Sequence, residues 1–208
     1  MIAPEQPITL STLAALSLYG LAVLLVGFGL SRTYPHARLG LCNIVTLTRL
    51  VIVAALAGAL LSGLDPSWPI FLLAALALSL DGVDGWLARR QNLSSAFGAR
   101  FDMEVDAAFA LMLALLAGAS GSAGPYVILL GLPHYIFLVA KFLLPWLGGA
   151  LPDRYGRKVV CVAQLATLIA LQLPFAISGS IDLVIIMVAL ALAWSFGRDI
   201  LWLWRSRS

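Results

Sequence analysis

Long apolar runs separated by short polar breaks dominate the chain. Seven of these runs approach the 20 or so mostly apolar residues that a transmembrane helix needs. They cover about 8–30, 45–63, 69–89, 98–119, 124–146, 158–177 and 181–204. The breaks, such as "SGLDPSWP" and "LGGALPDRYG", are rich in glycine, proline and polar turn residues. Runs such as "LVIIMVALALAW" are continuously apolar, which favours helices over the alternating strands of a β-barrel. The pattern predicts an all-α, polytopic transmembrane helical bundle.

Composition agrees with this prediction. Of 208 residues, 62% are hydrophobic and only 11% are charged, whereas a soluble domain carries about 25% charged residues. We therefore expect an integral membrane protein with a single compact bundle. The first ten residues contain no Lys or Arg, so the run at 8–30 lacks the basic start of a signal peptide and is predicted to be a retained transmembrane helix.

The distribution of charge predicts the orientation. With seven alternating spans, all 13 Lys and Arg residues fall on one side of the membrane, and the other side has only Glu5, Asp65 and Asp182. The positive-inside rule makes the basic side cytoplasmic and the N-terminus external. We expect the inner (cytoplasmic) membrane as the location, with membrane lipids and no nucleic acid as partners. The cations are Arg32, Arg38, Arg49, Arg89, Arg90, Arg100, Lys141, Arg154, Arg157, Lys158, Arg198, Arg205 and Arg207.

Five acids lie in one stretch, "DGVDGWLARRQNLSSAFGARFDMEVD", at residues 81–106. Asp81 and Asp84 are three residues apart at the end of the third predicted helix, so they share one face. Asp102 and Asp106 are four apart near the start of the fourth. A short loop makes these helices antiparallel neighbours, so the four carboxylates should converge one or two turns below the cytoplasmic surface. Glu104 falls on another face.

Such a cluster needs a counter-charge, because the insertion of each acid into the hydrocarbon core costs at least about 2.5–3.5 kcal/mol of free energy. Oxygen ligands suit Mg²⁺ or Mn²⁺, and two ions would fit four carboxylates and phosphoryl chemistry. Gly82 and Gly85 are costly inside a helix, which suggests close approach of a backbone or a ligand, and Arg89 can reach a phosphate. Together these features favour a phosphate-bearing lipid as substrate. A cation transporter or channel, or a structural polar network, is the alternative.

The spacing Asp81-x2-Asp84-Gly85-x2-Ala88-Arg89-x8-Gly98-x3-Asp102-x3-Asp106 resembles the complete signature of the CDP-alcohol phosphotransferases. The resemblance implies a six-helix core at 43–208. Residues 1–42 would then be an extra N-terminal transmembrane helix with its cytoplasmic juxtamembrane segment. The upstream stretch "NIVTLTR" is similar to a looser family pattern of Asn, Thr and Arg.

The resemblance also implies roles for individual residues. Asp81, Asp84, Asp102 and Asp106 would be metal ligands, and Asp106 would also be the catalytic general base. The nucleotide of a CDP-linked lipid would contact residues from both motifs. These are Asn43, Thr46, Asp84, Gly85 and Arg89. The implied reaction transfers a phosphatidyl group from CDP-diacylglycerol to a small polar alcohol with release of CMP, and the family suggests a homodimer.

The acceptor alcohol is left open by the sequence. Four cations, Lys141, Arg154, Arg157 and Lys158, form a candidate site for a phosphorylated acceptor such as glycerol 3-phosphate, or they serve only topology and lipid contact. "RKVVCVAQ" partly resembles a Lys-x-Lys-Thr pattern ending in Gln in phosphatidylglycerophosphate synthases. Lys158 and Gln164 match, but Val160 and Cys161 replace the second Lys and the Thr. Serine, an inositol phosphate and a lipid alcohol are the other acceptors considered.

Overall fold

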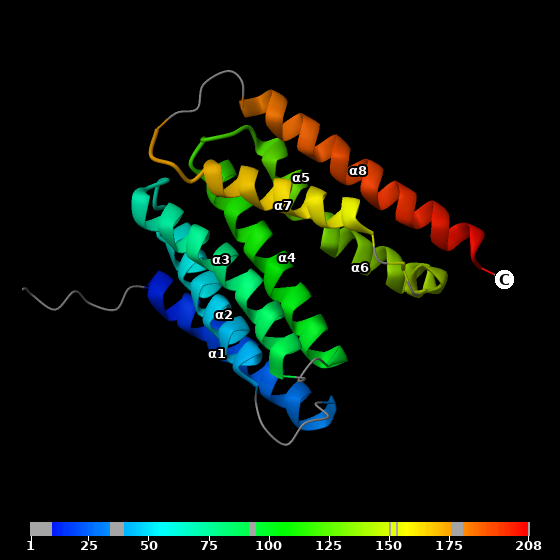
Figure 1. Ribbon diagram of the computed structural model, residues 1–208. Helices are drawn as coiled ribbons and strands as arrows, with labels where there is room; N and C mark the ends of the chain where they lie inside the picture. Colours follow the sequence, from blue (N-terminus) through cyan, green and yellow to red (C-terminus); the bar gives the residue numbers. More distant parts are fainter. Residues whose placement is uncertain are drawn as a thin grey trace, which may run out of the picture. The chain divides into compact units, whose positions relative to one another are not determined.

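The computed structural model describes residues 10–33, 40–91, 95–149, 151–152, 154–175 and 181–207, and this part of the chain is helical without strands (Figure 1). It confirms the all-α polytopic fold. The α-helices are α1 (Leu10–Thr33), α2 (Leu41–Leu61), α3 (Trp68–Gln91), α4 (Ala96–Ala119), α5 (Ile128–Gly131), α6 (Pro133–Leu143), α7 (Tyr155–Ala170) and α8 (Ile181–Arg205). Two 3₁₀ turns, η1 (Pro125–Val127) and η2 (Pro145–Gly148), flank α5 and α6.

The chain divides into two compact units, and the divisions fall between α2 and α3, inside α3 and inside α4. The first unit is Met1–Leu64 with Leu73–Val105, and the second is Asp65–Leu72 with Asp106–Ser208. In the first unit, α1 lies against α2. The backbone N–H of Leu41 donates a hydrogen bond of 3.1 Å to Gln91 Oε1, which connects the start of α2 to the end of α3. This connection fixes the end of α3 that follows the acidic residues.

The second unit has a core of tightly packed aliphatic and aromatic side chains. Leu113 of α4, Leu130 of α5 and Leu168 of α7 are all 0% exposed. Helix α8 packs against α5 and α7. Gly131 allows α5 to approach α4 closely, since a Cβ at this position would lie 2.9 Å from the Cα of Leu111. Such close helix contacts through small residues are typical of membrane proteins.

Three helical stretches in the described part are long and apolar enough to cross a membrane: Leu41–Leu61, Trp68–Leu87 and Ile181–Arg205. The bent pair Pro125–Gly131 and Pro133–Leu143 would make a fourth. The seven predicted runs correspond to α1, α2, α3, α4, the η1–α5–α6 segment, α7 and α8. Helix α4 is not among these stretches, because its first half carries the charged residues Arg100, Asp102, Glu104 and Asp106, and α7 has only 16 residues.

The predicted continuous span at 124–146 is instead broken. Helices α5 and α6 meet at an angle of 60° on either side of Leu132. Pro133 has no N–H and ends the hydrogen-bond ladder of the preceding turn. The carbonyl of Leu130 accepts a hydrogen bond from Gln164 Nε2 of α7. A polar side chain from a neighbouring helix thus satisfies a backbone group beside the break, as the membrane interior requires.

Candidate active site

The carboxylates predicted to converge come from α3 and α4. Asp84 is buried, with 4% of its surface exposed, whereas Asp81 and Asp102 are about one-third exposed. Carboxylate oxygens of Asp81 and Asp102 lie within 4.8 Å of each other. The two helices therefore bring these acids together, as their spacing predicts.

Arg49 of α2 lies at the centre of these acids. Its Nη1 is 3.0 Å from Asp81 Oδ1, 3.1 Å from Asp84 Oδ2 and 2.6 Å from Asp102 Oδ1. Its side chain is only 1% exposed. The charge pattern predicts Arg49 only as a cation of the cytoplasmic side and does not predict this central position. The signal was the last residue of "NIVTLTR", which belongs to the upstream family pattern.

Asn43 and Thr46 of α2, predicted to contact the nucleotide, are both buried at 4% exposure. Thr46 Oγ1 donates to Asp84 Oδ2 at 3.2 Å, so it lies beside the acids. Asn43 lies against the start of α4, where a Cβ added to Gly98 would be 3.5 Å from Asn43 Oδ1. The small residue at the Gly98 position of the motif therefore leaves room for Asn43.

The remaining motif residues are less completely described. Gly85 is half-buried, and the side chains of Ala88 and Arg89 lie outside the described residues. Gly82 is exposed, and within the described part of the chain no atom beyond its chain neighbours and the nearby backbone of its own helix lies within 4 Å of a Cβ built on it. Close approach of another backbone therefore does not explain Gly82, which leaves the ligand as the reason we suggested.

Asp106 follows Asp102 by one turn of the continuous helix α4, so both acids present their carboxylates on one face. Asp81 and Asp102 each offer one oxygen to a group that could hold a metal ion. Asp84 Oδ1 is buried and has no hydrogen-bond partner in the described structure. A buried carboxylate oxygen without a partner is costly, and a hard cation with oxygen ligands would satisfy it. The residues present therefore fit a divalent metal.

Two of the four predicted acceptor-site cations are paired with one buried acid. Arg154 Nη1 is 3.7 Å and Arg157 Nη1 is 3.6 Å from the carboxylate of Asp199, which is 5% exposed. Arg157 Nη2 also donates to the carbonyl of Pro152 at 2.5 Å. Lys141 and Lys158 are exposed. Asp199 is a lone acid near a helix end and belongs to no recognisable motif. Nothing in the sequence therefore distinguishes it as a functional residue.

Comparisons with known proteins identify the class. The family model for CDP-alcohol phosphatidyltransferase matches residues 39–196, so the chain belongs to this family of enzymes. Proteins from Mycobacterium bovis and Mycobacterium tuberculosis, each named "Putative cardiolipin synthase", are 29% identical to it over 156 residues. The match covers 74% of this chain and 72% of each relative. No solved structure matches the chain.

Family membership confirms the resemblance carried by the acidic motif. The protein is a transferase that acts on a CDP-linked lipid in phospholipid synthesis, and it is an integral membrane protein. The enzyme class replaces the transporter or channel considered as an alternative.

Proposed function

We propose that the protein transfers a phosphatidyl group from CDP-diacylglycerol to the hydroxyl of an alcohol, with release of CMP. The observation that carries this proposal is the set of carboxylates around Arg49, in a chain that belongs to a family of phosphatidyltransferases. Arg49 and a divalent cation are the counter-charges that make an acidic cluster tolerable and let it receive a pyrophosphate.

Asp106 is the proposed general base. Its carboxylate takes the proton from the acceptor hydroxyl, and the oxygen then forms a bond to the β-phosphorus, which carries the diacylglycerol. The bond between this phosphorus and the bridging oxygen breaks, and the electron pair leaves with CMP. Asp106 lies one turn deeper along α4 than Asp102 and is only half-buried, so it is accessible to a hydroxyl.

The proposed metal ligands are Asp81, Asp84, Asp102 and Asp106, with two Mg²⁺ or Mn²⁺ ions as the expected cofactors. Bound metal would neutralise the pyrophosphate and stabilise the leaving phosphate. For the nucleotide, we propose contacts from Asn43, Thr46, Asp84, Gly85 and Arg89. Asn43 and Thr46 are buried on the face of α2 that carries Arg49, which supports their assignment to this site.

The acceptor we favour is phosphatidylglycerol, with cardiolipin as the product. The name of the mycobacterial relatives supports a lipid acceptor. Val160 and Cys161 stand where the phosphatidylglycerophosphate synthase pattern has Lys and Thr, which argues against glycerol 3-phosphate. The acceptor phosphate, present in both alcohols, is assigned to the cation set of Lys141, Arg154, Arg157 and Lys158.

Several further assignments belong to this proposal. We assign residues 43–208 to the catalytic core and 1–42 to an additional N-terminal transmembrane helix with its juxtamembrane segment. The active site faces the cytoplasm and the N-terminus is external, because all 13 cations then lie on the cytoplasmic side. The working protein is a homodimer.

The deciding experiment is an acceptor screen with the purified protein. CDP-diacylglycerol and Mg²⁺ or Mn²⁺ are supplied with phosphatidylglycerol, glycerol 3-phosphate, serine or an inositol phosphate, and both CMP and the lipid product are measured. We expect cardiolipin with phosphatidylglycerol. Asp106→Asn should lower CMP release by about 10²-fold or more, whereas Glu104→Gln on the same helix should not. Metal-dependent CMP release by Asp106→Asn at the native rate would refute its assignment as the base.

A further inference from the structure

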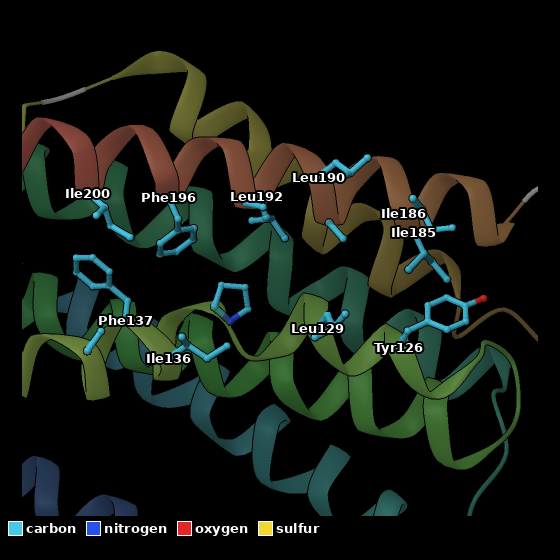
Figure 2. A pocket seen from close by; sticks show the side chains of 14 residues that line it. Tyr126, Leu129, Ile136, Phe137, Ile185, Ile186, Leu190, Leu192, Phe196 and Ile200 are labelled. Atoms are coloured by element: carbon cyan, nitrogen blue, oxygen red, sulfur yellow. The ribbon is translucent and has the colours of Figure 1, made fainter. Parts of the chain in front are cut away.

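An apolar groove of about 560 Å³ lies in the second unit between the broken helix α5–α6 and α8. Figure 2 shows side chains from both sides pointing into it, with Phe137 of α6 opposite Phe196 of α8. The two ring centroids are 5.9 Å apart. The groove has the volume of a small-molecule site, yet its lining is almost entirely aliphatic and aromatic, so it suits a hydrocarbon ligand.

The groove is elongated along α8. Its lining runs from Ile185 to Ile200 on this helix, which is about 22 Å at 1.5 Å per residue. One leaflet of the hydrocarbon core is about 15 Å thick. An extended acyl chain from one leaflet can therefore lie lengthwise in the groove.

The two ends of the groove differ in chemistry. At one end, the hydroxyl of Tyr126 donates to the carboxylate of Asp182, so this end presents an acid. At the other end, Pro133 and Phe137 of α6 line the groove and are four residues apart. Lys141 is the next residue on the same face of this helix. Lys141 is exposed, and its Cε lies 3.2 Å from the position of a Cβ on Gly148 in η2.

The same end carries a second cation held by tryptophans. Trp204, one turn beyond Ile200 on α8, packs edge-on against Trp146 of η2 with centroids 5.5 Å apart. The guanidinium of Arg207 lies 3.2 Å from the Trp204 ring centroid and 5.2 Å from that of Trp146. Turn η2 contacts both α6 and α8, so this cluster lies beyond the Ile200 end of the groove. Tryptophan with Lys and Arg is the composition of a headgroup-level site.

We propose that this groove binds one acyl chain of an anionic glycerophospholipid, with the lipid phosphate between Lys141 and Arg207. Charge complementarity selects this occupant, because basic residues at the end of an apolar groove between membrane helices favour an anionic headgroup. A second copy of the chain would have to place a like-charged end against this cluster. Lys141 also belongs to the acceptor-phosphate set proposed above, so this inference rests on the proposed function and adds to it the groove that receives an acyl chain.

The test uses the full-length Asp106→Asn protein, so that catalysis does not consume the lipid. Native mass spectrometry counts bound phosphatidic acid, which has no acceptor hydroxyl, against phosphatidylcholine of the same chains. Ala193→Trp fills the groove, and Met187→Trp places the same side chain on α8 outside the lining. We expect Ala193→Trp to lose the retained phosphatidic acid and Met187→Trp to keep it.

Charge variants keep the test decisive if Ala193→Trp does not fold. Lys141→Ala and Arg207→Ala should each lower the preference for phosphatidic acid over phosphatidylcholine by about fivefold, the effect of one cation near an anionic headgroup. Arg205→Ala, also at the end of α8, should leave this lipid preference unchanged. Equal retention of both lipids by all variants would overturn the proposal. Conversion of a dimer to a monomer by Ala193→Trp, without a change in bound lipid, would make the groove a subunit interface and would also overturn it.

Discussion

Arg49 Nη1 lies 2.6 Å from Asp102 Oδ1, and the same nitrogen contacts Asp81 and Asp84. One buried guanidinium from α2 thus connects the acids of α3 and α4. Removing one member of a buried ionic group leaves the remaining charges without a counter-charge, which typically lowers the free energy of unfolding by about 3–5 kcal/mol. The arrangement makes Arg49 both a stabilising residue and a counter-charge for the site.

We therefore predict that Arg49→Gln makes folding depend on divalent metal. In chelator, the melting temperature of this variant should fall well below that of the native protein, because three carboxylates lose their cation. Added Mg²⁺ or Mn²⁺ should restore most of the loss. Thermal unfolding with and without metal measures the effect. Arg100→Gln, an exposed cation of α4, is the matched control. Equal metal-dependent shifts in both variants would contradict the prediction.

Asp84→Asn should weaken metal binding itself. Its Oδ1 is buried without a hydrogen-bond partner, and Thr46 and Arg49 hold only the other oxygen. Loss of a residue that merely supports a ligand costs about 10–100-fold in metal affinity, so loss of a ligand should cost at least tenfold. Titration with Mn²⁺ followed by electron paramagnetic resonance gives the affinity directly. Glu104→Gln removes one acid outside the motif and should leave the affinity unchanged.

The sequence was sufficient to predict the class of fold and the convergence of the acids. Helical spacing places Asp81 with Asp84 and Asp102 with Asp106, and a short loop makes α3 and α4 neighbours. Arg49 could not be placed by this reasoning, since periodicity cannot distinguish a buried counter-ion from a topology signal. Asp199 was missed for a similar reason, because its importance comes from two arginines that are over 40 positions away in the sequence.

The break at Leu132 shows another limit of sequence reasoning. Pro133 signals a break, but the apolar run continues through it, and hydropathy alone predicts one straight helix. Whether a proline bends a membrane helix depends on whether a neighbour can satisfy the freed backbone groups. Here the neighbour is Gln164, which the sequence distinguishes only as a match to a family motif.

Gln164→Met should destabilise the protein by about 1 kcal/mol, because the carbonyl of Leu130 loses a hydrogen bond in an apolar environment. The side chains are similar in length, so packing changes little. Unfolding in a mixed detergent titration measures the difference. Val162→Met, an exposed position on the same helix, should change stability much less. An equal loss of stability in Val162→Met and Gln164→Met would show that the lost hydrogen bond is not the cause.

The pair of Arg157 and Asp199 allows a prediction about the acceptor. The Asp199 carboxylate and the carbonyl of Pro152 hold the Arg157 guanidinium in place, and a positioned guanidinium is well suited to a phosphate. Arg157→Ala should raise the KM for phosphatidylglycerol about tenfold, the loss of one charge-assisted hydrogen bond. The KM for CDP-diacylglycerol should stay within about twofold of the native value, a change below about 0.5 kcal/mol.

Asp199→Asn separates positioning from charge in the same kinetic assay. This variant keeps both arginines but removes the acid that holds them, so we expect a smaller rise in the acceptor KM than for Arg157→Ala. Arg205→Ala, which removes the cation at the last residue of α8, is the control and should change neither KM. A rise in the KM for CDP-diacylglycerol equal to that for the acceptor would assign Arg157 to the donor lipid and remove it from the acceptor site.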